Sequence, residues 1–279
     1  GFVQGQRALM DLSQWYHEYE QITDFSKFPI PFKCVAMDLI TGNQVVIGNG
    51  SLTRAVRASF SLPTIFTPVE WGDSLLIDGG VVNNLPVDIV KEMGADIVIA
   101  VNVSSQYKNP NQINNIIDVL VQSMSVHEYK LMYKNESKAD LIIRPDMNGF
   151  NTSDFDNDKF LPMIERGYTA AISVAEELKE IQKQAEKNIK NKSIHSLVKD
   201  PTIASIDING HNKLPFKFIY RLIGYEPGHI FNSKELENRI NNIYSLGYFN
   251  TIFYEINLNK NNTVDLTILI SEKPMREFN

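Results

Sequence analysis

The residue of this sequence best placed for chemistry is Asp78, which is followed directly by Gly79 and Gly80. It comes after a short apolar run at residues 75–77 that is typical of a β-strand. In open α/β sheets ligands bind at the carboxyl ends of strands, and paired glycines permit positive φ and a close backbone approach. The carboxylate would then be held on a tight turn at the working edge of the sheet. Asp-Gly is also a common turn dipeptide, and these three residues alone favour that simpler interpretation.

A catalytic triad containing histidine is the obvious alternative, and we do not expect one on this chain. The sequence has five histidines, which are His17, His127, His195, His211 and His229. His127 continues an apolar helical stripe at residues 113–124, which predicts a core or rim position. His195 lies in a polar linker, and His211 and His229 lie in turns. None of these settings is typical of a general base.

Serine and aspartate residues near the predicted strands are expected to be structural. Ser51 can cap a short helix, and Ser59 and Ser61 are expected to be packing or structural hydroxyls, because neither lies on a strand-to-helix elbow. Asp38 precedes a Thr-Gly turn, and Asp96 opens an apolar strand. Both carboxylates are therefore predicted to cap or turn the backbone.

Composition excludes several classes of protein. The 279 residues carry a net charge of −6, which argues against a nucleic-acid partner. Cys34 is the single cysteine, so neither an intramolecular disulfide nor a cysteine-based zinc site can form. The acidic stretch 154–158 lacks the glycine and the terminal glutamate of an EF-hand, so a solvated loop is expected there. No apolar run approaches the length of a membrane-spanning helix.

The first part of the chain is expected to alternate strands and helices. The predicted strands are residues 33–39, 44–48, 75–77, 96–103 and 139–145, and the predicted helices are 52–60, 87–93 and 113–124. The continuous β-branched run at 96–103 is typical of a strand buried on both faces. The alternation predicts a three-layer α/β fold with a mainly parallel sheet covered by helices.

A long helical stretch is predicted from Tyr168 onward, because apolar residues recur every three or four positions and would form one buried face. After Ile181 the pattern becomes polar all round, which is typical of a helix that leaves a domain. Pro201 marks the next start. We therefore expect one domain at residues 1–192, including a trailing linker helix, and a second at 201–279.

The second part follows the order β-α-α-β-β, which predicts a small α+β domain. Its predicted elements are a strand at 203–209, helices at 216–224 and 233–247, and strands at 251–258 and 264–270. In the last strand apolar and mostly polar residues alternate. This pattern fits a sheet with one covered face.

Five short motifs occur in a fixed order around Asp78. They are Arg57-Ala58-Ser59, Phe66-Thr67-Pro68, Asp78-Gly79-Gly80, Val82-Asn83-Asn84-Leu85-Pro86-Val87 and Met93-Gly94-Ala95-Asp96. This order resembles the patatin-like phospholipases, a family of serine lipid acyl hydrolases, and the resemblance covers most of residues 1–175. In that family the aspartate of the Asp-Gly-Gly motif pairs with a serine on a G-x-S-x-G elbow, without histidine. The resemblance implies that Asp78, on a turn shaped by Gly79 and Gly80, orients and deprotonates that nucleophile.

The sequence departs from that family because it contains neither a G-x-S-x-G motif nor a glycine-rich oxyanion loop. In the family both precede the point that matches Gly1. We therefore expect residues 1–192 to be the C-terminal portion of a hydrolase domain whose nucleophile and oxyanion loop lie upstream. The chain by itself is expected to be inactive.

Four motifs in the second part also occur in order. They are Ile206-Asp207-Ile208-Asn209-Gly210, Tyr225-Glu226-Pro227-Gly228, Tyr244-Ser245-Leu246-Gly247-Tyr248-Phe249 and Glu272-Lys273-Pro274. They resemble the POTRA domain, a periplasmic unit that precedes outer-membrane β-barrels; an unrelated small α+β domain is the alternative. The resemblance implies a barrel after Asn279 and the outer membrane of a Gram-negative bacterium. The POTRA-like domain would be periplasmic, and the hydrolase domain would lie at the surface or in the periplasm.

Two functions from different classes follow. The first is a bacterial lipid acyl hydrolase, a phospholipase or esterase with a Ser-Asp dyad and no metal or organic cofactor. Its partners would be a lipid or fatty-acyl ester substrate, the outer-membrane barrel and the barrel-assembly machinery. The second is a non-catalytic binding or translocation scaffold joined to that barrel. A cytosolic α/β binding protein without a membrane link is a third alternative.

Overall fold

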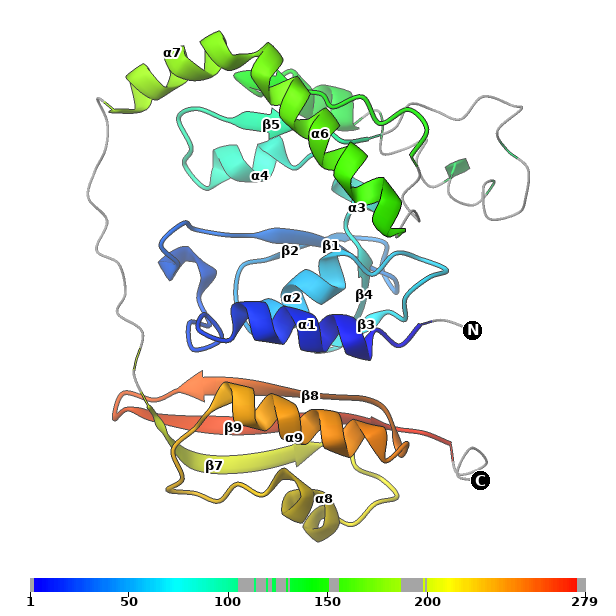
Figure 1. Cartoon of the computed structure of the whole chain (residues 1–279), viewed down its shortest axis with the longest axis vertical. Helices are drawn as coiled ribbons and strands as arrows, with labels where there is room; N and C mark the ends of the chain where they lie inside the picture. The colour runs from blue at the N-terminus through cyan, green and yellow to red at the C-terminus, as the bar shows by residue number, and fades with distance from the viewer. Residues whose placement is uncertain are drawn as a thin grey trace. The chain divides into compact units, whose positions relative to one another are not determined.

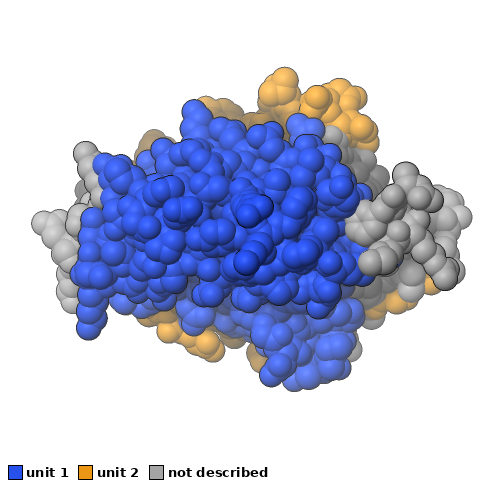
Figure 2. Space-filling view, turned by 90° about the horizontal axis from the view of Figure 1, so that it is seen from below, with its two compact units in different colours: residues 1–78, 193–279 blue, residues 79–192 orange. Residues whose placement is uncertain are grey.

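The structure is a computed structural model that describes residues 3–104, 113, 119, 122–123, 129, 131–150, 156–186, 198 and 200–274 (Figure 1). The chain divides into two compact units, drawn in two colours in Figure 2. Unit 1 combines Gly1–Asp78 with Ser193–Asn279, and unit 2 is Gly79–Lys192. In the described part of the chain, none of the helices has the length and hydropathy needed to cross a bilayer. The domain boundary expected between residues 192 and 201 stays a prediction.

The sheet that carries Asp78 has four strands in the order β2-β1-β4-β3. They are β1 (Cys34–Asp38), β2 (Gln44–Ile47), β3 (Val69–Trp71) and β4 (Ser74–Asp78). All three neighbouring pairs are antiparallel, so the parallel pairing expected for this region is not found here. Short turns join β1 to β2 and β3 to β4, and a short turn can join only antiparallel strands. The antiparallel pairing of β1 with β4 joins segments far apart in the sequence.

Three short helical segments accompany this sheet: α1 (Gln6–Tyr16), the 3₁₀ turn η1 (Phe25–Lys27) and α2 (Leu52–Ser59). The predicted cap of α2 is confirmed, since the Ser51 side chain accepts a hydrogen bond from Arg54 N at 3.3 Å. The core between helices and sheet consists of fully buried apolar residues, namely Phe25, Ala36, Ala55, Ala58 and Leu76. Their burial fixes β1, α2 and β4 against one another.

Unit 2 begins with the helices α3 (Gly80–Asn83) and α4 (Val87–Glu92) and contains the parallel pair β5 (Ile99–Val101) and β6 (Leu141–Ile143). Strand β5 is shorter than the predicted 96–103. Its prediction of burial on both faces is wrong, because Ile99 and Val101 are 42% and 52% exposed whereas Ala100 is buried. Strand β6 is the one strand neighbour of β5 in the described part of the chain. The apolar stripe expected at 113–124 falls mostly outside the described residues.

The long helical stretch is present as α6 (Asn157–Ser173) and α7 (Ala175–Glu186), interrupted at Val174. Its predicted buried face is wrong in α6, where no residue is buried. The apolar side chains on this helix that are at least half exposed are Leu161, Ile164, Tyr168 and Ile172. The helical spacing was therefore a correct guide to the helix but not to what covers it.

The C-terminal module has the predicted order β7 (Thr202–Asn209), α8 (Phe216–Ile223), α9 (Ser233–Ser245), β8 (Phe249–Leu258) and β9 (Thr263–Glu272). Its sheet has the order β7-β9-β8, with β7 parallel and β8 antiparallel to β9. The alternation predicted for the last strand is confirmed, since every second residue is buried: Val264, Leu266, Ile268 and Ile270. These residues pack with Leu236 and Ile240 of α9 in one core.

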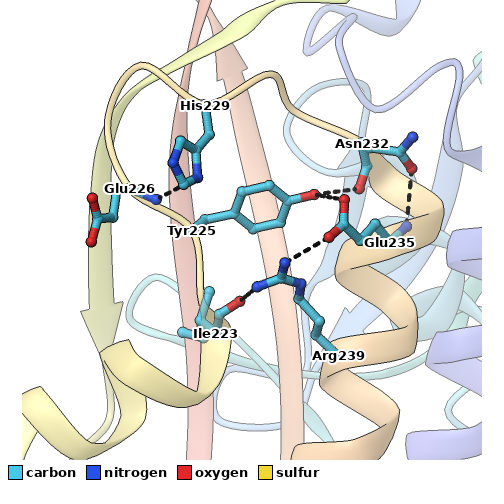
Figure 3. A network of polar contacts seen from close by, with 7 residues as sticks. All are labelled: Ile223, Tyr225, Glu226, His229, Asn232, Glu235 and Arg239. Carbon is cyan, nitrogen blue, oxygen red and sulfur yellow. Dashed lines mark hydrogen bonds and ion pairs between the residues drawn. The ribbon is translucent and has the colours of Figure 1, made fainter.

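A polar network fixes the connection between α8 and α9 (Figure 3). Arg239 donates to Ile223 O at 2.8 Å and to Glu235 Oε1 at 2.6 Å, and its guanidinium lies 4.8 Å from the Tyr225 ring centroid. The Tyr225 hydroxyl lies 3.2 Å from both Asn232 O and Glu235 Oε2. Arg239 therefore joins the end of α8 to the first turn of α9, which the Asn232 side chain caps by accepting from Glu235 N at 3.0 Å.

Candidate active site

Asp78 is the last residue of β4, a strand held on both sides by hydrogen-bonded neighbours. It lies opposite Ala36 of β1, and its backbone N donates to Ser61 O at 3.1 Å. The two residues before it, Leu76 and Ile77, are buried, whereas Asp78 is half-buried. The carboxylate is thus carried by a rigid strand and has partial access to solvent.

The turn after Asp78 differs from the sequence expectation. Gly79 has φ −72° and ψ −20°, and neither Gly79 nor Gly80 is among the positive-φ glycines of the described chain. Neither glycine therefore adopts the left-handed backbone conformation. Instead Gly79 caps α3 and Gly80 opens it, so the chain passes from strand to helix directly behind the carboxylate.

Buried amides hold α3 in place within unit 2. Asn135 Nδ2 donates to Asn83 Oδ1 at 3.1 Å, to Leu85 O at 3.0 Å and to Asp88 Oδ1 at 3.2 Å. Asn83 Nδ2 donates to the same Asp88 oxygen at 3.1 Å. Because Asn83 and Asn135 are almost fully buried, each of these bonds is costly to lose. These bonds fix α3 to the neighbouring segments of unit 2.

Arg57 is the main residue near Asp78 that the sequence reasoning left without a role. It is 1% exposed, and it donates to Ser61 Oγ at 2.5 Å and to Thr67 O at 3.3 Å. Its guanidinium also lies 4.6 Å from the centroid of Phe66. Burial lowers the pKa of Arg57 to about 10. The backbone oxygen of Ser61 accepts the hydrogen bond from Asp78 N. By holding the Ser61 side chain, Arg57 therefore stabilises the end of β4.

The sequence contains one signal for this role, which is an arginine four residues before a serine and followed by the aromatic residues Phe60 and Phe66. A side chain at Gly5 would lie 2.6 Å from Arg57 Nε, so glycine there leaves room for the guanidinium. That close approach joins positions far apart in the sequence. It could not be read from local spacing.

Structural roles are expected for Ser51, Ser59, Ser61, Asp38 and Asp96, and hydrogen bonds confirm them for all but Asp96. The Ser59 hydroxyl donates to Val35 O at 2.7 Å, and that of Ser61 donates to Arg57 O at 2.8 Å. Asp38 accepts from Thr41 Oγ1 at 2.8 Å and from two backbone amides. These hydrogen bonds, that of Thr41 first, lower the pKa of Asp38. Asp96 is exposed and precedes β5 by three residues.

Two of the described histidines contact backbone atoms of residues close to them in the sequence. His17 Nδ1 lies 2.8 Å from Gln14 O, and His229 Nδ1 accepts from Glu226 N at 3.3 Å in the turn drawn in Figure 3. His127 and His195 lie outside the described residues. Burial raises the pKa of Cys34 to about 12, which keeps the thiol neutral. No group of three or more metal-ligating side chains occurs in the part of the chain that the structure describes.

Comparison with protein families gives two matches in the predicted order. Residues 20–91 match the model of the patatin-like phospholipases, and residues 201–273 match the POTRA model, described as a surface antigen variable number repeat. The first match includes Asp78 and the segment through α3. The second covers nearly the whole C-terminal module.

Individual relatives agree with the first match. An uncharacterized NTE family protein of Mycobacterium bovis is 47% identical over 62 residues, which is 22% of this chain and 11% of that protein. Another from Mycobacterium tuberculosis is 37% identical over 84 residues, 30% of this chain and 23% of that protein. The mouse patatin-like phospholipase domain-containing protein 7 is 30% identical over 169 residues, 50% of this chain and 12% of that protein. The aligned segments thus span less than a quarter of each relative.

Among solved structures, POTRA1-3 of the periplasmic domain of Omp85 from Anabaena aligns over 85% of both chains. The sequence identity is 10% and the TM-score is 0.25.

Proposed function

We propose that this chain supplies the aspartate half of a lipid acyl hydrolase, a phospholipase or esterase with a Ser-Asp dyad. The observation that carries the proposal is the position of Asp78, half-buried at the end of β4 and held by the hydrogen bond to Ser61 O, inside the segment that matches the patatin-like phospholipases. A general base must be held rigidly and must still reach its partner. Both requirements fit this carboxylate.

The reaction proposed is acyl transfer from an ester to water. A serine outside these 279 residues attacks the ester carbonyl, and Asp78 accepts the hydroxyl proton as the new C–O bond forms. The oxyanion is held by backbone amides of a glycine-rich loop that also lies outside the chain. The alcohol leaves with that proton, and water then attacks the acyl-serine and releases the fatty acid. Gly79 and Gly80 shape the turn behind the carboxylate.

The C-terminal module suggests where the enzyme acts. We propose that the POTRA-like domain is periplasmic and links the hydrolase portion to an outer-membrane barrel of a Gram-negative bacterium. The barrel and its assembly machinery would be the protein partners, and a lipid or fatty-acyl ester would be the substrate. The POTRA match at residues 201–273 supports this placement.

Activity profiling of the full-length protein with a fluorophosphonate probe tests the enzymatic proposal. We expect the probe to label one serine, and peptide mapping to place it in a G-x-S-x-G motif before the residue numbered Gly1 here. The 279-residue chain should remain unlabelled. A full-length protein that resists the probe and contains no such motif would instead support the scaffold function.

A further inference from the structure

Helix α8 of the C-terminal module has one side in the core and one side in solvent. It packs against α9 and β7 (Figure 1), and its residues Ile219 and Ile223 are fully buried in the core of the module. Residues two positions apart in an α-helix lie on nearly opposite sides of it. Lys217 and Arg221 therefore lie on the outer side of α8, where both are exposed, and together they form its basic ridge.

Two exposed aromatic residues, Phe216 and Phe218, lie on either side of this basic ridge. They are 42% and 40% exposed. The Phe216 ring stacks on Tyr220 with the centroids 5.5 Å apart, and the Phe218 ring meets Tyr248 edge-on at 6.5 Å. These contacts limit the motion of both phenyl groups, so little side-chain entropy is lost when the rings bind a partner.

The charge of this segment differs from that of the chain. Residues 211–224 contain three basic residues, Lys213, Lys217 and Arg221, and no acidic residue, whereas the whole chain has a net charge of −6. Within the described part of the chain, the side chains of Lys217 and Arg221 form neither a salt bridge nor a hydrogen bond. The surface of α8 is therefore locally positive on a protein whose net charge is negative.

Lys213 and Glu272, by contrast, hold the segment that precedes α8. Lys213 Nζ donates to Lys273 O at 2.8 Å. The Glu272 carboxylate accepts from the backbone N of Asn212 at 3.2 Å, of Lys213 at 2.8 Å and of Leu214 at 3.0 Å. These bonds use both charged groups to fix the start of α8, so the basic ridge is the part of this segment that is left for a partner.

We propose that α8 binds an anionic phospholipid surface. Lys217 and Arg221 contact headgroup phosphates there, while Phe216 and Phe218 enter the boundary between the headgroups and the acyl chains. An acidic protein would satisfy the two charges, but the exposed rings beside them favour a partner that is anionic and apolar within the width of one helix. Because the chain is acidic overall, repulsion keeps its other faces away from such a surface and orients the module.

Sedimentation of the whole 279-residue chain with lipid vesicles tests this proposal. We expect the chain to bind vesicles of phosphatidylglycerol and phosphatidylcholine in equal parts about tenfold more tightly than vesicles of phosphatidylcholine alone. Lys217→Gln combined with Arg221→Gln should weaken binding to the mixed vesicles about tenfold, because the attraction to the headgroups is lost. The control, Arg7→Gln combined with Lys260→Gln, removes the same charges at exposed positions outside α8 and should leave binding unchanged.

The aromatic contribution is tested at Phe216. Phe216→Gln should weaken binding to the mixed vesicles about fivefold, because an apolar ring no longer enters the interface. Phe216→Trp keeps an aromatic ring and should bind at least as well as the parent chain. Circular dichroism of both variants checks that the module stays folded.

Three results would overturn the proposal. They are a parent chain that does not bind the mixed vesicles, equal binding by the parent chain and the variant that lacks Lys217 and Arg221, and unchanged binding by Phe216→Gln. Poly-glutamate that binds the parent chain, and loses affinity only in the variant without the basic ridge, would assign α8 to an acidic protein instead. The vesicle assay measures binding without hydrolysis, so its result is independent of the role proposed for Asp78.

Discussion

Arg57 is a fully buried charged residue. None of the carboxylates that the structure describes forms a salt bridge with it. Two hydrogen bonds, aromatic contacts and packing stabilise its guanidinium in the core. Its Nε is buried without a hydrogen-bond partner in the described structure. We expect Arg57→Met to lower the free energy of unfolding by about 2 kcal/mol or more, because Ser61 and Thr67 O lose a donor and a cavity forms. Chemical denaturation measures this effect.

The control for Arg57 is Arg7→Ala. The side chain of Arg7 is 95% exposed in a loose ion pair with Asp11, so this change should alter stability by less than about 0.5 kcal/mol. If both variants were equally stable, the support that we assign to Arg57 would be absent.

Glu237 gives a prediction about pH. Its folded-state pKa is raised, chiefly by desolvation, while hydrogen bonds from Ser13 and Tyr254 and the charge of His17 act in the opposite direction. A raised carboxyl pKa contributes stability that is fully present below the unfolded value and is lost as pH rises through the folded value. We expect Glu237→Gln to raise the melting temperature more at pH 7 than at pH 4.

The control for that change is Glu226→Gln, at an exposed position of the same module. Its effect on the melting temperature should be small at both pH values. A stabilisation by Glu237→Gln that did not grow between pH 4 and pH 7 would contradict a raised pKa.

At the residue scale, much of the candidate site could be predicted. The order of motifs singled out Asp78, and local turn and cap chemistry gave correct roles for Ser51 and Asp38. The same reasoning failed for Gly79, because a strand-to-helix passage needs no positive φ. It also missed Gln6, whose partner is 246 residues away.

A comparison of two glycines in the C-terminal module distinguishes the cost of backbone strain from the cost of steric contact. Gly210 and Gly228 have φ of +86° and +92°. A Cβ at Gly210 would lie 2.0 Å from Ile270 O, whereas one at Gly228 would meet nothing within 4 Å. We expect Gly228→Ala to cost about 1 kcal/mol for the left-handed conformation. Gly210→Ala should cost at least about 2 kcal/mol more, because β7 must also move from β9.

Thermal and denaturant unfolding of these two variants measure the difference. Equal losses of stability would mean that β7 and β9 accommodate the added methyl group. The close approach of Gly210 to Ile270 O would then not limit which residue fits at this position.

At the element scale, strand and helix positions were easier to predict than their neighbours. The alternation of apolar and polar residues in β9 predicted both the strand and its covered face, because successive side chains of a strand point to opposite faces of the sheet. The β-branched run around β5 gave the strand but the wrong burial. Likewise, antiparallel pairing of β1 and β4 depends on residues 40 positions apart, which local patterns do not contain.

At the scale of the whole molecule, the chain joins a patatin-like segment to a POTRA-like module in the order that the sequence motifs predicted. The contacts of Gln6, Ser13 and Gln21 make residues 3–78 and the module parts of one compact unit. Sequence motifs identify modules separately, so they carry no information about such contacts. The patatin-like segment and the module should therefore influence each other's stability.

We propose that Asp78 is the base of an acyl hydrolase. The most direct measurement is the rate of hydrolysis of a chromogenic fatty-acyl ester by the protein extended upstream through its serine motif, with Asp78→Asn compared to Asp73→Asn. Asp73 is an exposed residue of the turn before β4. We predict that Asp78→Asn lowers the rate about a thousandfold, since general-base catalysis contributes 10²–10⁴-fold, and that Asp73→Asn leaves it unchanged. A folded Asp78→Asn protein that hydrolyses the ester at the parent rate would show that Asp78 is not the base.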